Sequence, residues 1–428
     1  MREDRHPVVD VSGGASRRRR TFSTPLLFAA IAIATSCASA AAADRTHPYV
    51  PANDSTVLEH LPSTRDPRVR RFDALRQQTA ARPRDLHRSV ALANAYLDYG
   101  RDTGDARYLG RAQAVIAPWL AKQPAPIDAL LVQATILQSR HQFVESRRML
   151  QAILLRDPDN TQAWLTLSAV ALVQGDMDEA QRDCAQLITG SDALVAAGCI
   201  AARATVTGNA KSALALLDRL LDQSQGEPAP VQSWVRGLMA DAAQTLGKDA
   251  RAEREFKAAL QLTPGDNFLI ADYADFLLDH GRAREALELT RPYAQSDTSF
   301  LRQVLAEAAL KLPEADADIA RMASRFRDLE QRGDSRLYAR EEARFVLELQ
   351  HDPARALQLA RTNWSYQRAP QDVRIFLQAA LAAGQPAAAR DVLGFIARTQ
   401  LEDPTIRALA AKLSSQLPAS ASATGPGR

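Results

Sequence analysis

A repeat of about 34 residues, running from near residue 86 almost to the C-terminus, constrains the fold of this chain more than any other feature. The clearest unit begins at Thr161, and units in the same register begin at Ser233 and Asn267. In the first of these, large, apolar and small residues hold fixed places: Trp164, Leu167, Ser168, Ala171, Ala180 and Cys184. Such a unit predicts two antiparallel helices with an apolar seam. Because one unit cannot bury that seam alone, the units must stack.

These residues resemble the tetratricopeptide repeat (TPR) superfamily, and the resemblance extends over residues 86–417. It implies an all-α fold, a right-handed superhelical solenoid of about nine antiparallel helix pairs. A leading helix is expected over Asp66–Thr79 and a capping helix over Thr405–Leu417, so that the solenoid spans residues 66–417. The chain also resembles a group of exported TPR proteins from GC-rich bacteria, a group without an assigned biochemical role.

The N-terminus has the order of a secretory signal peptide. Four consecutive arginines, Arg17–Arg20, precede a short apolar run over Pro25–Ala34. Small residues then form Ala-x-Ala patterns that end at Ala40 and at Ala43. A basic segment, an apolar segment and small residues before the cleavage site are the three parts of such a signal. We therefore expect residues 1–43 to be a signal peptide and the mature chain to be periplasmic.

Three alternatives to a simple cleaved signal stay open. Residues 34–37 resemble a lipobox without its usual leucine, so Cys37 is a possible lipidation site of a membrane-anchored lipoprotein. Arg19 and Arg20 fit a twin-arginine signal, and the uncharged residues 21–43 could just span a bilayer if left uncleaved. Residues 44–65 are expected to be extended and mobile. Residues 418–428 are expected to be disordered, because they contain no core-forming side chain.

The charge distribution excludes a nucleic-acid binder. The chain has 53 basic and 50 acidic residues, a net charge of +3. Six of the basic and three of the acidic residues lie in the first 43, which leaves the body neutral, with 47 of each. A protein that binds nucleic acid needs a basic surface to neutralise phosphates. The partners expected here are proteins, and membrane contact is expected only if Cys37 is lipidated or the signal is retained.

The first helices of a TPR solenoid line its concave groove, and the resemblance implies that a partner peptide or helix binds there. Six groove positions carry the expected binding residues: Trp234, Asp241, Phe268, Asp272, Asp275 and Glu307. An aromatic and acidic groove would suit a basic or amphipathic partner. The simpler reading is that the acidic residues are only solvated.

We therefore expect a non-enzymatic interaction scaffold or adaptor in the bacterial cell envelope. Two alternatives are a polysaccharide- or small-ligand-binding component of an export or assembly machine, and a maturation factor or enzyme with a cryptic site. The sequence contains no HExxH, Cys-x-x-Cys, EF-hand loop, GxxxxGK[ST], GxGxxG or G-x-S-x-G pattern. No catalytic, metal or cofactor residue is expected.

A disulfide is expected between Cys184 and Cys199, the only cysteines left after signal removal. Export places them in a compartment where disulfides persist. The two residues lie on consecutive helices, each about one turn from the connection between those helices, which brings them within bonding distance. The alternative is a pair of reduced cysteines that serve as small core residues.

Overall fold

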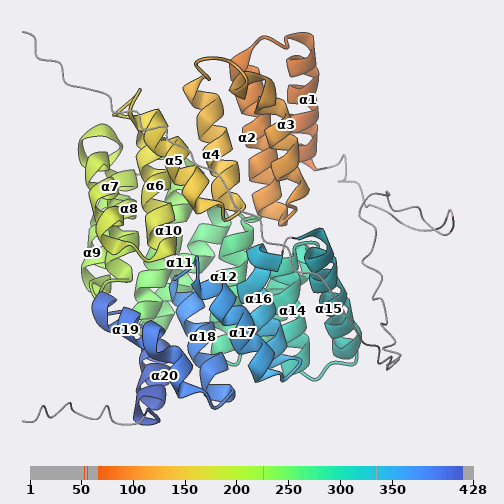
Figure 1. Cartoon of the computed structure of the whole chain (residues 1–428), viewed down its shortest axis with the longest axis vertical. Coiled ribbons are helices and arrows are strands. Elements are labelled where there is room, and N and C mark those ends of the chain that lie inside the picture. Colours follow the sequence, from red (N-terminus) through yellow and green to blue (C-terminus); the bar gives the residue numbers. More distant parts are fainter. Residues whose placement is uncertain (1–52, 54, 56–65, 225, 334, 418–428) are drawn as a thin grey trace, which may run out of the picture. The chain divides into compact units, whose positions relative to one another are not determined.

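The computed structural model describes residues 53, 55, 66–224, 226–333 and 335–417. Within these residues it contains 20 α-helices, three short 3-10 helices and no strand (Figure 1). All the helices lie in one compact unit, Pro62–Arg428. The predicted all-α class is confirmed. The predicted signal peptide, its alternative lipidation site Cys37 and the tail over 418–428 lie outside the described residues, as does nearly all of 44–65.

Consecutive helices form nine pairs, flanked by a leading and a capping helix as the repeat predicts. The leading helix is α1 (Pro67–Ala81) and the capping helix is α20 (Pro404–Ser415). The first four pairs are α2 (Leu86–Thr103) with α3 (Arg107–Leu120), α4 (Ile127–Ser139) with α5 (Phe143–Leu154), α6 (Thr161–Gln174) with α7 (Met177–Gly190), and α8 (Ala193–Thr205) with α9 (Ala210–Gln223). The other five are α10 (Ala229–Thr245) with α11 (Asp249–Leu262), α12 (Asn267–Asp279) with α13 (Ala283–Thr290), α14 (Asp297–Ala309) with α15 (Ala315–Arg332), α16 (Ala339–Glu348) with α17 (Pro353–Trp364), and α18 (Pro370–Ala382) with α19 (Arg390–Thr399).

Short polar side chains fix where several helices begin. Asp85, Asn160, Asp176 and Asp266 each accept a hydrogen bond from a backbone N–H in the first turn of the following helix. Such caps satisfy amides that have no partner inside the helix. Between α6 and α7 the chain turns at Gly175, whose φ of 80° is a conformation that favours glycine. Caps and turns together set the length of each pair.

Apolar seams between and within the pairs make up the core. One large cluster joins helices α8 to α14 and includes Leu217, Met239 and Phe256, each at most 1% exposed. A second joins α14 to α20 and includes Phe300 and Phe376. Small residues allow the close approach that these seams need, because buried alanines alternate with the large side chains. Smaller clusters pack α1 to α4, α4 to α6, and α7 against α8.

Pairs that are distant in sequence also touch. The backbone N–H of Arg368, between α17 and α18, donates a hydrogen bond to the carbonyl of Val173 in α6 at 2.7 Å. Near the other end, Gly104 lies so close to Ser296 that an added Cβ would come within 2.6 Å of its hydroxyl. The repeat thus coils back on itself, which a repeat with contacts only between neighbours would not do.

Candidate binding cavity

The first helices of seven consecutive pairs converge on one cavity of about 410 Å³. Its wall takes residues from α6, α8, α10, α12, α14, α16 and α18, with further residues from α7, α19 and α20. This arrangement follows from the stacking, because each pair presents its first helix to the same side. A cavity of this size falls in the range of small-molecule sites, about 300–1,000 Å³.

The C-terminal helices close part of this cavity. An added Cβ on Gly175 would lie 2.8 Å from Arg368 and 2.9 Å from Phe395, and both of these residues line the cavity. An added Cβ on Gly208 would lie 3.1 Å from Gln400. The turns after α6 and α8 therefore meet the segments around α18 and α19. The expected open groove is replaced on this side by a wall of the chain itself.

A buried ion network forms one wall of the cavity. Arg302 on α14, whose side chain is 5% exposed, binds Asp275 on α12 at 2.7 Å and also pairs with Glu341 on α16. Arg344 on α16 pairs with the same Asp275. Burial by itself would raise the pKa of Asp275, but the two guanidinium groups outweigh it and hold the pKa below its usual range. These charges are satisfied by one another and join three first helices.

Two other carboxylates in the cavity have no such support. Asp241 on α10 and Asp272 on α12 both line it, and neither has a hydrogen bond or an ion pair with any residue that the structure describes. Burial raises the pKa of Asp241 to about 6. Burial, with the negative charges of Asp241 and Asp275, raises the pKa of Asp272 to about 8, although the positive charges of Arg302 and Arg340 act in the opposite direction. An acidic pair of this kind is stabilised by whatever positive group comes between its members.

Of the six expected groove residues, the structure brings three together: Asp241, Asp272 and Asp275 all line the cavity. Asp275 is already occupied by Arg302 and Arg344. The acidic part of the expected site therefore gathers at one place, with two of its members unpaired.

The other three expected residues, Trp234, Phe268 and Glu307, lie outside the lining of this cavity. Trp234 packs on Gly198 of α8, where an added Cβ would be 2.5 Å from the indole, so its ring fills the seam between first helices. Phe268 is 58% exposed at the start of α12, outside the cavity lining. Glu307 is 1% exposed and accepts a hydrogen bond from Gln303 at 2.8 Å, also outside the lining.

The arginines of the ion network are functional candidates that sequence reasoning missed. Arg302 sits among apolar residues of α14, whereas Arg344 lies on a charged face of α16 with Arg340, Glu341 and Glu348. A cationic side chain in the middle of an apolar helix face is unusual unless it is paired, and this is the signal that could have found Arg302.

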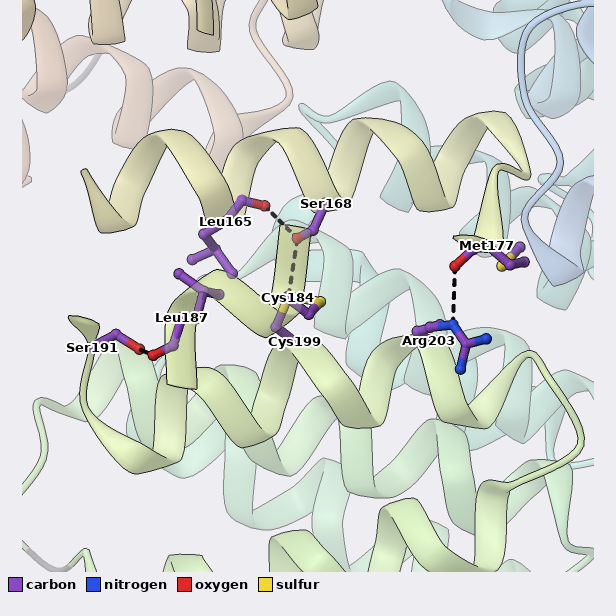
Figure 2. Close-up of a disulfide and its surroundings, with 8 residues drawn as sticks. All are labelled: Leu165, Ser168, Met177, Cys184, Leu187, Ser191, Cys199 and Arg203. Atoms are coloured by element: carbon purple, nitrogen blue, oxygen red, sulfur yellow. Dashed lines mark hydrogen bonds between the residues drawn. A yellow bond between two sulfur atoms is a disulfide. The ribbon is translucent and has the colours of Figure 1, made fainter. Parts of the chain in front are cut away.

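Cys184 on α7 and Cys199 on α8 are joined by a disulfide, with a Cα–Cα distance of 5.6 Å (Figure 2). The predicted pairing is therefore present in the structure. Both residues are at most 2% exposed, and the hydroxyl of Ser168 on α6 lies 3.0 Å from the sulfur of Cys199. The bond fastens the second helix of one pair to the first helix of the next.

In the described part of the chain, no group of three or more His, Cys, Asp or Glu residues could hold a metal ion. Among the same residues, no helix has the length and apolar character needed to cross a bilayer.

No protein-family model matches the sequence, and no curated protein matches it. Several solved structures, in contrast, align with the chain. The APC/C hetero-tetramer Cut9–Hcn1 aligns with a TM-score of 0.50 and 11% identity, over 81% of this chain and 66% of that one, so this chain spans slightly less than two thirds of it. A tetratricopeptide repeat protein from Parabacteroides merdae aligns with a TM-score of 0.35 and 14% identity, over 72% of this chain and 99% of that one. PilW, a type IV pilus biogenesis factor, aligns with a TM-score of 0.30 and 16% identity, over 51% and 99%. The alignment with Cut9–Hcn1 and the nine stacked helix pairs agree in the fold alone, an all-α array of stacked antiparallel helices.

Proposed function

We propose that this protein is a non-enzymatic binding scaffold of the bacterial cell envelope, which holds a short segment of a partner protein in the cavity between its first helices. The observation that carries the proposal is the convergence of seven first helices on one cavity that contains two unpaired carboxylates. Polar groups left unsatisfied in an otherwise ordered wall are typical of sites completed by a ligand.

The proposed location rests on two features. The N-terminal sequence has the order of a signal peptide, and the paired cysteines suit an oxidising compartment.

The closed side of the cavity limits the size of a ligand that can enter. A helix has a diameter of about 10–12 Å with its side chains, so a cavity of about 410 Å³ suits an extended segment of a few residues better than a helix.

A small ligand is the second candidate, and the closure by α18 and α19 is the observation that favours it. The volume is typical of pockets that enclose small molecules. Both candidates use the same cavity, so one experiment can separate them.

Site-specific photo-crosslinking tests the proposal. A photoreactive residue in place of Gln244, which lines the cavity, should capture a protein in envelope extracts of the source organism. The matched control places it at Ile188, which is 61% exposed on α7 and lies outside the cavity lining. Capture of a protein from position 244 but not from 188 is the expected result. Capture of small molecules alone would favour the second candidate, and equal capture from both positions would refute binding in the cavity.

A further inference from the structure

We infer that the cavity recognises a primary ammonium group on a short apolar stem, held by Asp241, Asp272 and Thr245. This inference rests on the proposed function, because it takes the cavity to be the binding site. It goes further in that it names the chemical group bound and the atoms that bind it.

The three polar groups come from two touching helices. Asp241 and Thr245 lie one helical turn apart on α10, hence on one face of it. Asp272 belongs to α12, which meets α10 where an added Cβ on Gly237 would be 3.0 Å from Leu269. All three line the same cavity. The wall thus presents two carboxylates and a hydroxyl toward one space.

Thr245 is the observation independent of the acidic pair. It is 8% exposed, lines the cavity and makes no hydrogen bond to any described residue. Thr205 holds the equivalent place at the end of α8 and also lines the cavity. Its hydroxyl, by contrast, donates a hydrogen bond to the carbonyl of Ala201 at 2.9 Å. The hydroxyl oxygen of Thr245 stays accessible from the cavity and is therefore available to a ligand. Thr245 therefore lacks the partner that its counterpart has.

An ammonium group fits this set of acceptors. It carries three N–H donors and no acceptor, and the site offers three separate acceptor groups. A guanidinium would need two acceptors side by side in its plane, as Asp275 already supplies to Arg302. Ca²⁺ takes six to eight oxygen ligands and Mg²⁺ an octahedron, more than two carboxylates and a hydroxyl provide.

The rest of the lining favours an apolar stem. The lining includes apolar side chains, among them Leu172, Met177, Leu238 and Phe276, beside arginines that are paired with other carboxylates, and Phe276 lies one turn beyond Asp272 on the same face of α12. An alkyl chain that ends in an ammonium group would place its methylenes against these side chains and its charge between the carboxylates. This ligand chemistry has two possible sources, the side chain of a partner's lysine and a free alkylamine.

Calorimetric titration of the purified chain with 1-aminopentane tests the inference, with 1-pentanol as the uncharged probe of equal length. The amine should bind and the alcohol should not. Asp241→Asn and Asp272→Asn should each weaken binding at least about tenfold, because each removes a charged hydrogen-bond acceptor. Thr245→Val should weaken it by about fivefold without lowering the melting temperature, because the hydroxyl has no partner to lose. Asp98→Asn, an exposed change on α2, should leave binding unchanged.

An acetylated and amidated Ala-Lys-Ala peptide distinguishes the sources. Tighter binding of the peptide, with the same response to the variants, identifies a partner's lysine. Tighter binding of the free amine identifies a small ligand, and either result supports the ammonium site. Equal binding of amine and alcohol, binding of Ca²⁺ but not of the amine, or amine binding unaffected by the Asp variants would overturn it. If photo-crosslinking from position 244 still captures a partner in that case, the proposed function stands and only this inference falls.

Discussion

Replacing Asp272 by Asn should stabilise the unliganded protein at neutral pH, by an amount that grows with pH. The pKa of this carboxyl is raised from 3.8 to about 8 in the folded chain. A raised pKa means that the folded state keeps a proton which the unfolded state loses. The group's contribution to stability is therefore lost as pH rises from about 4 to about 8, and it is constant outside that window. Asn cannot ionise, so the stability of the variant does not fall with pH for this reason.

The size of this change in the free energy of unfolding follows from the interval between the unfolded and folded pKa values of Asp272. Each pKa unit corresponds to about 1.4 kcal/mol, so ionisation across the interval from 3.8 to 7 is worth at most about 4 kcal/mol. Water in the cavity and the shared titration with Asp241 reduce that figure. We expect the difference in free energy of unfolding between Asp272→Asn and the unchanged chain to increase by about 2–4 kcal/mol between pH 4 and pH 7.

Urea unfolding followed by circular dichroism at pH 4.5, 6, 7 and 8.5 measures this difference. Asp98→Asn, which removes an exposed carboxylate from α2, is the control and should change stability by less than about 0.5 kcal/mol at every pH. A difference for Asp272→Asn that stays constant with pH would refute the reasoning, as would a variant less stable than the unchanged chain at pH 8.5.

Three further predictions concern the disulfide, the ion network and export. Cys184→Ala with Cys199→Ala should lower the free energy of unfolding by about 3 kcal/mol, since the bond closes a loop of 15 residues; equal urea midpoints for the oxidised chain and the variant would contradict this. Arg302→Met should cost about 3–5 kcal/mol because it leaves carboxylates buried without their cation, and an unchanged melting temperature would exclude that role. N-terminal sequencing of the exported protein should begin after Ala40 or Ala43; an intact residue 1 would contradict cleavage, and a blocked N-terminus would favour the lipoprotein alternative.

Periodicity predicted the helix pairs because the apolar and small positions repeat within each unit, where local packing decides the structure. The predicted disulfide followed from the same register. Two acidic residues, Asp241 and Asp272, were predicted in the groove because their positions face away from the seam. The contact of Trp234 with Gly198 could not be predicted, because it depends on a glycine on the preceding first helix that no pattern within one unit reveals.

Closure of the cavity could not be predicted from the repeat. It depends on the backbone of Arg368, on turn residues such as Gly175, and on their meeting after many intervening helices. Turn residues lack the periodic signal that identifies helices, and contacts between distant units have no fixed spacing. The pairing of Arg302 with Asp275 and Glu341 was missed for a related reason, since it joins three first helices that the sequence separates.

The contact between Arg368 and Val173 also bears on how the chain unfolds. An array in which each repeat touches only its neighbours can fray from either end, and its stability is close to a sum of local terms. A link between residues 173 and 368 ties the middle of this array to its C-terminal part. Loss of the last helices would then loosen α6 and α8 as well, so that unfolding becomes more cooperative and folding slower than in an open array of equal length.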